Sequence, residues 1–494
     1  MAQPDISYGA KLCQMAEVQP DAPAVSCGPK TLTYQQLHRR TNRLARGLAT
    51  YGVKAGNLVT LGLPNDIGFI EACWAIWKLG ATPQPVSFRL PTGELEAIIA
   101  LAAPPVVIAE VQHKIDRPIL TISDIAARSE DESDLEDRVA PVNRALTSGG
   151  STGRPKLILA GRAGLAPAAM DPVSFWRMRP REVSLVPAPL YHTSGFAMMV
   201  DALTIGAHLV IMPRFDPEAT LAEIAARGAA CAYLVPTMMG RIWRLPEAVR
   251  DRYDVSSIKT VWHLSSPCPP WLKEAFIHWL GPDVVMERYG GAESQAIAEI
   301  TGAEWLAHRG SVGRVIMGEM KVFDEAGQPA LVGQTGEIYL RRPQGAAPTY
   351  SYVGAEARTL PDGWESLGDM GWFDGDGFLY LADRRTDMVL VGGANVYPAE
   401  IEAALEEHPA VQSCAVVGLP DDDLGNQVHA IIQARSEISA DELKAFLADR
   451  LVTYKRPRSY EFVDHPLRDD AGKMRRTALR DERIARMKTA SSAA

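Results

Sequence analysis

Apolar residues in the first hundred positions recur at two spacings, one typical of helices and the other of buried strands. Leu37, Leu44 and Leu48 lie at helical intervals. They follow Thr33 and Gln36, which have the form of a capping box at a helix start. Strands therefore alternate with helices from the start of the chain. The segments expected as strands are 58–63, 82–86 and 105–109, and those expected as helices are 67–79 and 92–101.

The same alternation continues after an acidic, polar stretch at 126–140, which we expect to be a surface connection. Strands joined through helices form βαβ units, whose strands run parallel. The predicted class is therefore α/β, with a mixed, mainly parallel sheet in a large N-terminal domain. The later strands are expected at 183–186, 207–211 and 232–235, with a helix at 217–227.

The pattern changes around residues 374–383, where glycine and aspartate turns separate short strands. Beyond them the sequence predicts a smaller α+β unit. We therefore expect an N-terminal domain of several α/β subdomains over 1–383 and a small, mobile C-terminal domain over 384–494. The elements expected in the small domain are helices at 398–407 and 440–451 and strands at 415–418 and 428–433.

Composition and charge narrow the class of protein further. The 494 residues, 47% apolar and 22% charged, are typical of a folded globular chain. The net charge of −9 disfavours a general nucleic-acid binder, which would show a basic face. No apolar run reaches membrane-span length and no secretory leader is visible, so we expect a cytoplasmic protein. The six cysteines show no metal-ligand spacing, and a homodimer is one option for the oligomeric state.

Candidate chemistry begins at residues 147–156, where glycines and hydroxyl side chains precede a lysine. Glycines let backbone N–H groups approach phosphate oxygens, hydroxyls add donors, and the lysine adds a cation. The segment is not a Walker A loop, because Arg154 and Pro155 separate the last glycine from the lysine. The residues predicted to bind phosphate are Ser148, Gly149, Gly150, Ser151, Thr152, Gly153 and Lys156.

Four further motifs follow this loop in order, at 289–293, 367–369, 383–402 and 471–476. They read Tyr-Gly-Gly-Ala-Glu, Leu-Gly-Asp, a hinge-like segment that starts Asp-Arg, and Ala-Gly-Lys-Met-Arg-Arg. Together with the loop they resemble the signature motifs of the adenylate-forming superfamily, which includes acyl-CoA synthetases, amino-acid adenylation domains and firefly luciferase. Five ordered motifs are far more specific than any one of them, and the resemblance spans most of the chain.

The resemblance implies roles for the residues of a nucleotide site. Asp369 would accept hydrogen bonds from both ribose hydroxyls, a bidentate task that suits a carboxylate. Tyr289, followed by Gly290, would stack on adenine. Arg384 would contact the ribose or the phosphates. Glu293 would be a catalytic residue that holds Mg²⁺ on the ATP phosphates, since hard cations prefer carboxylate oxygen.

The resemblance also implies a reaction in two steps, with ATP, Mg²⁺ and CoA as cofactor or co-substrates. A carboxylic acid would attack the α-phosphorus of ATP, and Lys473 would stabilise the negative charge that develops there. The small domain would then rotate and present the chain around Gly392 and Gly393 to the channel through which the CoA thiol attacks. The expected activity is that of an acyl-CoA ligase.

Four positions depart from the family motifs. Gly149 and Leu367 replace Ser or Thr, and Ala292 removes a hydroxyl beside the Mg²⁺ glutamate, which weakens contact with the metal or AMP. Thr386 stands where the family usually has an Asp or Lys as its pivot. A pivot depends on backbone freedom more than on one side chain, so a domain rotation is still expected.

Position 192 bears on the acid that is activated. Amino-acid adenylation domains carry an aspartate for the α-amino group where this chain has His192, and an imidazole would not pair with an ammonium group. The resemblance places His192 beside the acyl and pantetheine sites, as a catalytic residue. We expect a bulky hydrophobic acid, either steroid- or bile-acid-like, aryl or medium-chain. A roomy apolar cavity is predicted from Gly195, Ala197, Met198, Met199 and Thr237.

Two other functions stay open beside the acyl-CoA ligase. One is a stand-alone adenylating enzyme that passes the acyl group to a carrier-protein thiol or to an amine. The other is a non-enzymatic nucleotide-binding protein, which the joint presence of Lys473, Glu293 and Asp369 disfavours. The partners expected for the ligase are a small carboxylic acid, ATP and CoA.

Overall fold

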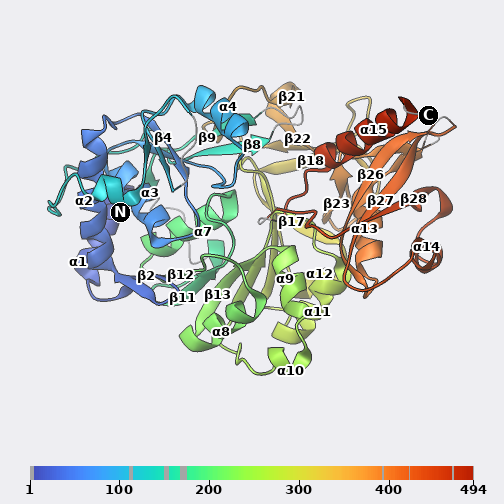
Figure 1. Ribbon diagram of the computed structural model, residues 1–494, viewed down its shortest axis with the longest axis horizontal. Coiled ribbons are helices and arrows are strands. Elements are labelled where there is room, and N and C mark those ends of the chain that lie inside the picture. The colour runs from blue at the N-terminus through green and yellow to red at the C-terminus, as the bar shows by residue number, and fades with distance from the viewer. Residues whose placement is uncertain are drawn as a thin grey trace.

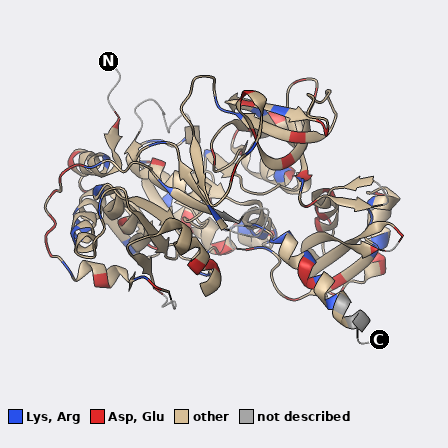
Figure 2. Cartoon of the chain, turned by 90° about the horizontal axis from the view of Figure 1, so that it is seen from above, with Lys and Arg blue, Asp and Glu red and all other residues tan. Residues whose placement is uncertain are grey.

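A computed structural model of the chain shows a broad body and a smaller domain at its C-terminal end. Figure 1 shows the body in blue to yellow and the small domain in orange to red. In the view from above (Figure 2) the small domain again stands apart, and acidic and basic residues are interspersed in both parts. No helix among the described residues has both the length and the apolar character needed to cross a membrane. The structure describes residues 5–110, 115–149, 155–166, 175–391, 394–421, 423–469 and 472–492.

The main sheet of the body has fourteen strands, and its first half is parallel. Strands β2, β12, β11, β13, β14 and β15 pair in that order with parallel neighbours, and β3 pairs with β2 antiparallel. The carboxyl ends of the parallel strands meet at one edge, where α/β sheets commonly bind ligands. The bounds are β2 (Pro23–Cys27), β3 (Lys30–Thr33), β11 (Val183–Val186), β12 (His208–Ile211), β13 (Ala229–Leu234), β14 (Thr260–His263) and β15 (Val285–Tyr289).

The second half of the main sheet is antiparallel, which limits the predicted parallel arrangement to the earlier strands. After β15 the order is β16, β17, β23, β22, β19 and β18, with β21 on the side of β22. The predicted α/β class with a mixed sheet is confirmed. The bounds are β16 (Ile297–Thr301), β17 (Ser311–Met317), β18 (Glu319–Phe323), β19 (Gly336–Arg341), β21 (Arg358–Leu360), β22 (Trp364–Phe373) and β23 (Leu379–Arg384).

Two smaller sheets complete the body, beside the short pair β1–β10. One has four parallel strands in the order β5-β4-β6-β7, and the other has three antiparallel strands in the order β20-β9-β8. The hairpin β8–β9 brackets the predicted phosphate loop in the sequence. The bounds are β1 (Ile6–Ser7), β4 (Leu58–Gly62), β5 (Thr82–Pro85), β6 (Val107–Ala109), β7 (Ile119–Leu120), β8 (Ala145–Gly149), β9 (Pro155–Ala160), β10 (Leu165–Ala166) and β20 (Tyr350–Val353).

The helices of the body follow the apolar pattern of the sequence. Helix α2 starts at the capping box of Thr33 and Gln36, as predicted. Helix α3 is buried along almost its whole length, which explains why its sequence is apolar on every side. The bounds are α1 (Tyr8–Val18), α2 (Tyr34–Thr50), α3 (Ile67–Lys78), α4 (Thr92–Ala102), α5 (Ile122–Ala126), α7 (Thr193–Thr204), α8 (Pro217–Arg227), α9 (Pro236–Trp243), α10 (Glu247–Arg250), α11 (Pro270–Leu280) and α12 (Gly302–Ala307).

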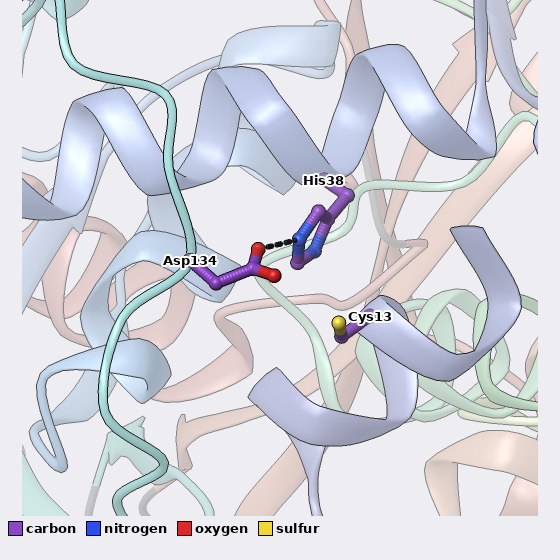
Figure 3. A group of neighbouring side chains, drawn as sticks. All are labelled: Cys13, His38 and Asp134. Carbon is purple, nitrogen blue, oxygen red and sulfur yellow. Dashed lines mark hydrogen bonds and ion pairs between the residues drawn. The ribbon is translucent and has the colours of Figure 1, made fainter. Parts of the chain in front are cut away.

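The acidic connection 127–140 is fastened to α2 by a polar group that also includes Cys13 of α1 (Figure 3). The Nε2 atom of His38 lies 2.7 Å from the carboxylate of Asp134. On the other side of the ring, Lys78 Nζ lies 3.1 Å from Nδ1. Both imidazole nitrogens are therefore occupied, and the group serves to hold the connection in place.

The small domain has its own apolar core around the hairpin β26–β27. Both strands of this hairpin are longer than the predicted segments 415–418 and 428–433, because polar residues at their ends continue the ladder. The bounds are β24 (Val389–Val391), β25 (Ala394–Val396), α13 (Pro398–Glu406), β26 (Val411–Asp421), β27 (Gly425–Ala434), α14 (Ala440–Ala448), β28 (Ser459–Val463) and α15 (Arg476–Ser492).

Candidate functional site

A lysine from β9 and a glutamate that follows β15 meet at the edge of the main sheet. Lys156 Nζ lies 3.9 Å from Glu293 Oε1, and Glu293 is only 6% exposed. Tyr352 on β20 donates its hydroxyl to the same carboxylate oxygen at 2.6 Å, and Lys156 Nζ lies 3.7 Å from the centre of its ring. Burial lowers the pKa of Lys156, and the nearby Glu293 opposes this shift. The β8–β9 hairpin thus brings its lysine to the predicted Mg²⁺ ligand.

A second carboxylate, Asp369, lies between Tyr289 and Arg384. Asp369 and Arg384 are register partners on the antiparallel strands β22 and β23, and Arg384 Nε lies 3.4 Å from Oδ1. The Tyr289 hydroxyl donates to Oδ2 at 2.7 Å. Burial raises the pKa of Asp369, while Arg384 and Tyr289 counteract the rise. The residues predicted for the ribose end of the nucleotide are therefore neighbours, and Tyr289 contributes its hydroxyl as well as its ring.

Glycine is required in the turn between Tyr289 and Glu293. A Cβ atom at Gly291 would lie 2.4 Å from Leu367 Cδ1 and 2.6 Å from Glu293 Oε2. At Gly290 it would lie 3.0 Å from the Ala296 carbonyl oxygen. Leu367, one of the departures from the motifs, thus fills the space beside this turn. A larger residue than glycine at position 291 would displace either Leu367 or the glutamate.

Lys473 reaches this region from the small domain. Gly472 has φ +75°, a left-handed value that favours glycine, and a Cβ atom there would lie 2.9 Å from Thr237 Oγ1 at the start of α9. The Lys473 N–H donates to Asp469 Oδ1 at 2.9 Å, which closes the turn. Lys473 is exposed at its surface, but desolvation by the surrounding protein and the positive charge of Arg384 lower its pKa, whereas Asp469 and Glu293 oppose the shift. The lysine therefore shares the electrostatic environment of the nucleotide residues.

His192 stands at the start of α7, and the positive charge of Lys473 affects its protonation. Burial and the charge of Lys473 lower the pKa of His192 to about 3, so the imidazole is neutral at physiological pH. Its Nε2 atom is buried and has no hydrogen-bond partner within the described residues. A buried nitrogen of this kind is available to a bound group. The five residues Lys156, Glu293, Arg384, Lys473 and His192 thus influence one another.

The junction between the domains is held by a guanidinium among carboxylates. Arg476 lies 3.4 Å from Asp383, contacts Asp387 and donates twice to Glu402, at 2.9 and 2.8 Å. Burial raises the pKa of Asp383 to about 6, although Arg476 favours its ionised form. Within the described residues, the side chain of Thr386, the expected pivot, makes one weak contact of 3.5 Å, with Asp387. The junction therefore relies on charged neighbours of Thr386 and not on its own side chain.

Several sequence predictions have a different outcome. Met198 and Met199 pack in the main core, and Gly195 is a glycine because Pro189 O would lie 2.5 Å from its Cβ atom. These residues do not support the expected roomy cavity. Tyr352 had no motif to mark it and was missed. Gly150, Ser151, Thr152, Gly153, Gly392 and Gly393 lie outside the described residues, as does the side chain of Ser148.

The ends of the predicted phosphate loop are nevertheless fixed. Ser148 pairs with Lys156, and Gly149 pairs with Pro155, across the hairpin β8–β9. A Walker A loop joins a strand to a helix, whereas residues 150–154 join two antiparallel strands in sequence. The conclusion that this is not a Walker A loop is therefore consistent with the strands on either side.

The large and the small domain each bring a lysine, Lys156 and Lys473, to the neighbourhood of Glu293, as expected for an adenylate-forming enzyme. The family model described as AMP-binding enzyme matches residues 13–351, and that described as AMP-binding enzyme C-terminal domain matches residues 400–473. The chain belongs to the AMP-binding enzyme family. The predicted family and its enzymatic nature are thereby confirmed.

Relatives and solved structures agree with this family. The chain is 31% identical to a feruloyl-CoA synthase of an Amycolatopsis species, over 94% of this chain and 96% of that protein. It is 30% identical to a fatty acid–[acyl-carrier-protein] ligase of Streptomyces coeruleorubidus, over 94% of each. An o-succinylbenzoate CoA synthetase of Bacillus subtilis, solved with its acyl-adenylate intermediate, superposes with a TM-score of 0.81 and 25% identity over 97% of this chain and 99% of that one.

Proposed function

We propose that this enzyme is an ATP-dependent carboxylic acid:CoA ligase that forms an acyl-adenylate, releases pyrophosphate and then forms an acyl-CoA thioester. The observation that carries the proposal is that the Lys473 turn of the small domain rests on Thr237 of the large domain, where the charge of Lys473 interacts with Glu293, with Arg384 at the end of β23 and with His192. Such an arrangement surrounds a polyphosphate with cations from two sides. Domain closure of this kind also excludes water from a reactive adenylate.

In the first step the residues of the large domain would hold ATP. Asp369 would accept hydrogen bonds from the ribose hydroxyls. Lys156 would contact the phosphates at the open end of the hairpin β8–β9. Glu293 fits Mg²⁺, because it offers a buried carboxylate while phosphate oxygens and water supply the remaining ligands. The ion would neutralise phosphate charge and orient the leaving pyrophosphate. Lys473 would stabilise the charge that develops on the α-phosphate.

In the second step the thiol of CoA would attack the adenylate carbonyl, with AMP as the leaving group. Lys473 is then no longer required, and the small domain would turn about residues 384–387. Gly392 and Gly393 would line the thiol channel in that arrangement. Two of the three similar proteins above are named as CoA ligases or synthetases, which supports CoA as the acceptor. Transfer to a carrier protein, named for the third, is an outcome of the test below.

We further propose an aryl-carboxylic acid as the substrate. Ferulate and succinylbenzoate both carry an aromatic ring, and they are named for the similar proteins. The neutral, buried His192 would not bind an α-ammonium group, which disfavours amino acids. Neither ferulate nor succinylbenzoate is a steroid or a bile acid, so the steroid- or bile-acid-like acid expected from the sequence is not supported.

The test is pyrophosphate release from ATP with a panel of acids, each with and without CoA. The sharpest pair is 3-phenylpropionate and phenylalanine, which differ only in the α-amino group. We expect release with 3-phenylpropionate and ferulate, multiple turnovers only when CoA is added, and little release with phenylalanine. Preference for phenylalanine would overturn the substrate class. Turnover that depends on a carrier protein and not on CoA would overturn the acceptor.

A further inference from the structure

A groove of about 340 Å³ lies between the two domains, bordered by Thr237 and Asp469 beside the Lys473 turn. Residues of helices α9 and α11 line it on the side of the large domain, and residues of the hairpin β26–β27 line it on the side of the small domain. Its charged lining consists of Arg241, Arg244, Arg435, Arg468, Glu406 and Asp469. The four arginines outnumber the two carboxylates, so the groove carries an excess of positive charge.

The two carboxylates are already engaged by other groups. Arg468 lies 3.7 Å from Glu406, and Asp469 accepts the N–H of Lys473. By contrast, neither Arg244 nor Arg435 forms an ion pair with any carboxylate in the described part of the chain. Among the described residues, Arg244 donates to the main-chain carbonyl oxygen of Gln412 at 3.0 Å, and its guanidinium lies 5.6 Å from the centre of the Trp271 ring. The guanidinium groups of these two arginines therefore have hydrogen-bonding capacity to spare.

Arg244 and Arg435 line the same groove from opposite domains. Burial and the positive charge of Arg435 lower the pKa of Arg244 to about 10, whereas the nearby Glu406 opposes the shift. The Ser413 hydroxyl in the same groove is buried and lacks a hydrogen-bond partner among the described residues. Two guanidiniums without an ion pair among the described residues, beside an unsatisfied buried hydroxyl, form a surface that an anion would complete.

We propose that this groove binds a small phosphate-bearing anion between Arg244 of the large domain and Arg435 of the small domain. Guanidinium groups match phosphate oxygens in bidentate fashion, and Ser413 supplies a further donor. A cavity of this volume accommodates inorganic phosphate or a nucleoside bisphosphate. Neither Arg244 nor Arg435 belongs to the nucleotide site described above, although Thr237 and Asp469 of the Lys473 turn border the groove.

Because one arginine comes from each domain, the anion binds only when the domains have the present arrangement. By linkage, its binding stabilises that arrangement. The present arrangement has Lys473 beside the nucleotide residues, so the anion would favour adenylate formation and slow the thioester step. This last consequence rests on the proposed function, whereas the binding site itself does not.

Binding is tested by equilibrium dialysis of the whole chain against radiolabelled phosphate, with α,β-methylene-ATP present so that phosphate cannot enter the nucleotide site. We compare Arg435→Gln with Arg252→Gln, a matched loss of one exposed arginine that pairs with Glu218 outside the groove. Loss of a charge-assisted contact weakens phosphate binding at least about tenfold in Arg435→Gln. Arg252→Gln retains the wild-type affinity. Equal affinity in both variants, or no binding to wild type, would overturn the site.

The source of the anion and its consequence are tested with the same proteins. Adenosine 3′,5′-bisphosphate replaces phosphate in a second dialysis. Binding that is tighter than that of phosphate and also depends on Arg435 points to the nucleotide end of CoA. Binding that is weaker than that of phosphate points to free phosphate. Thioester formation from a supplied acyl-adenylate and CoA is then followed as phosphate is added. We expect slowing in wild type and Arg252→Gln but not in Arg435→Gln. Equal slowing in wild type and in both variants would overturn the proposed coupling between anion binding and the thioester step. Absence of any ligase activity would count against the proposed function but would leave the dialysis result unaffected.

Discussion

The ribose end of the site and the Lys473 turn are built in opposite ways. Asp369 and Arg384 are register partners on two strands of the main sheet, and the Tyr289 hydroxyl fixes the carboxylate from a third strand. Lys473 stands on a short turn of another domain, whose glycine rests on Thr237. Groups needed throughout a reaction suit a rigid sheet, whereas a group needed in one step suits an element that moves.

The largest effect that would test this comparison is expected for Lys473→Ala. Loss of a preorganised charge beside the α-phosphate reduces adenylate formation by about 10²–10³-fold. Formation of thioester from a supplied acyl-adenylate and CoA stays near the wild-type rate, because the lysine is not needed there. ATP–pyrophosphate exchange and thioester formation are measured separately, with Lys444→Ala as a control on an exposed lysine of the small domain. Equal losses in both steps would argue against the alternation of domains.

A smaller effect, present in both steps, is expected for Asp369→Asn. The substitution keeps the shape of the side chain but removes the negative charge of the group that would accept hydrogen bonds from the ribose hydroxyls. ATP affinity falls by roughly 10–100-fold, the equivalent of about 1.5–3 kcal/mol. Calorimetric titration with ATP and with AMP measures these affinities. The affinities for both nucleotides fall alike, because the ribose is common to them. Unchanged affinity for AMP would remove Asp369 from the nucleotide site.

A still smaller effect is expected for Tyr289→Phe, which keeps the ring and removes the hydroxyl that donates to Asp369. Burial already raises the pKa of Asp369, and the lost donor raises it further. The ionised carboxylate is therefore lost at a higher pH in the variant as pH falls. AMP affinity drops about two- to tenfold at pH 8, and the gap from wild type widens toward pH 5.5. Titrations of both proteins at each pH cancel the protonation of AMP itself, and a gap that narrows in acid would contradict this role.

The sequence located most of the residues in this comparison but not their contacts. Asp369, Arg384 and Glu293 stand in recognisable motifs. The contact between Asp369 and Arg384 depends on the pairing of β22 with β23, which motif spacing does not contain. Tyr352 lies in an ordinary alternating strand, so nothing in the sequence marked it. Met198 was misassigned because apolar character fits a pocket wall and a core equally well, and only tertiary packing separates them.

Secondary structure was predicted well wherever the apolar period was long. Helix 217–227 and strand 183–186 have the predicted bounds. Most of the antiparallel strands after residue 289 were not predicted, because several of them, such as β17 and β22, are exposed or partly exposed over most of their length and show no continuous apolar run. Strand β26 was underestimated for a related reason: hairpin pairing extends it beyond its apolar centre.

The smallest effect is expected at the contact between the domains made by Arg475 and Glu94. Arg475 follows the Lys473 turn closely, and its Nη1 atom lies 3.1 Å from Glu94 Oε2 on α4. The arginine side chain is 64% exposed and that of the glutamate 31%, so solvent screens the pair and its contribution is at most about 1 kcal/mol. Glu94→Gln therefore reduces ATP–pyrophosphate exchange by no more than about fivefold, and Glu96→Gln on the same helix leaves it unchanged. Because the Debye length falls to about 3 Å at 1 M salt, exchange assays in high salt should bring wild type and Glu94→Gln together. A difference that persists in high salt would mean that Glu94 acts through a buried contact, and that the Lys473 turn is held more rigidly than its exposed surroundings indicate.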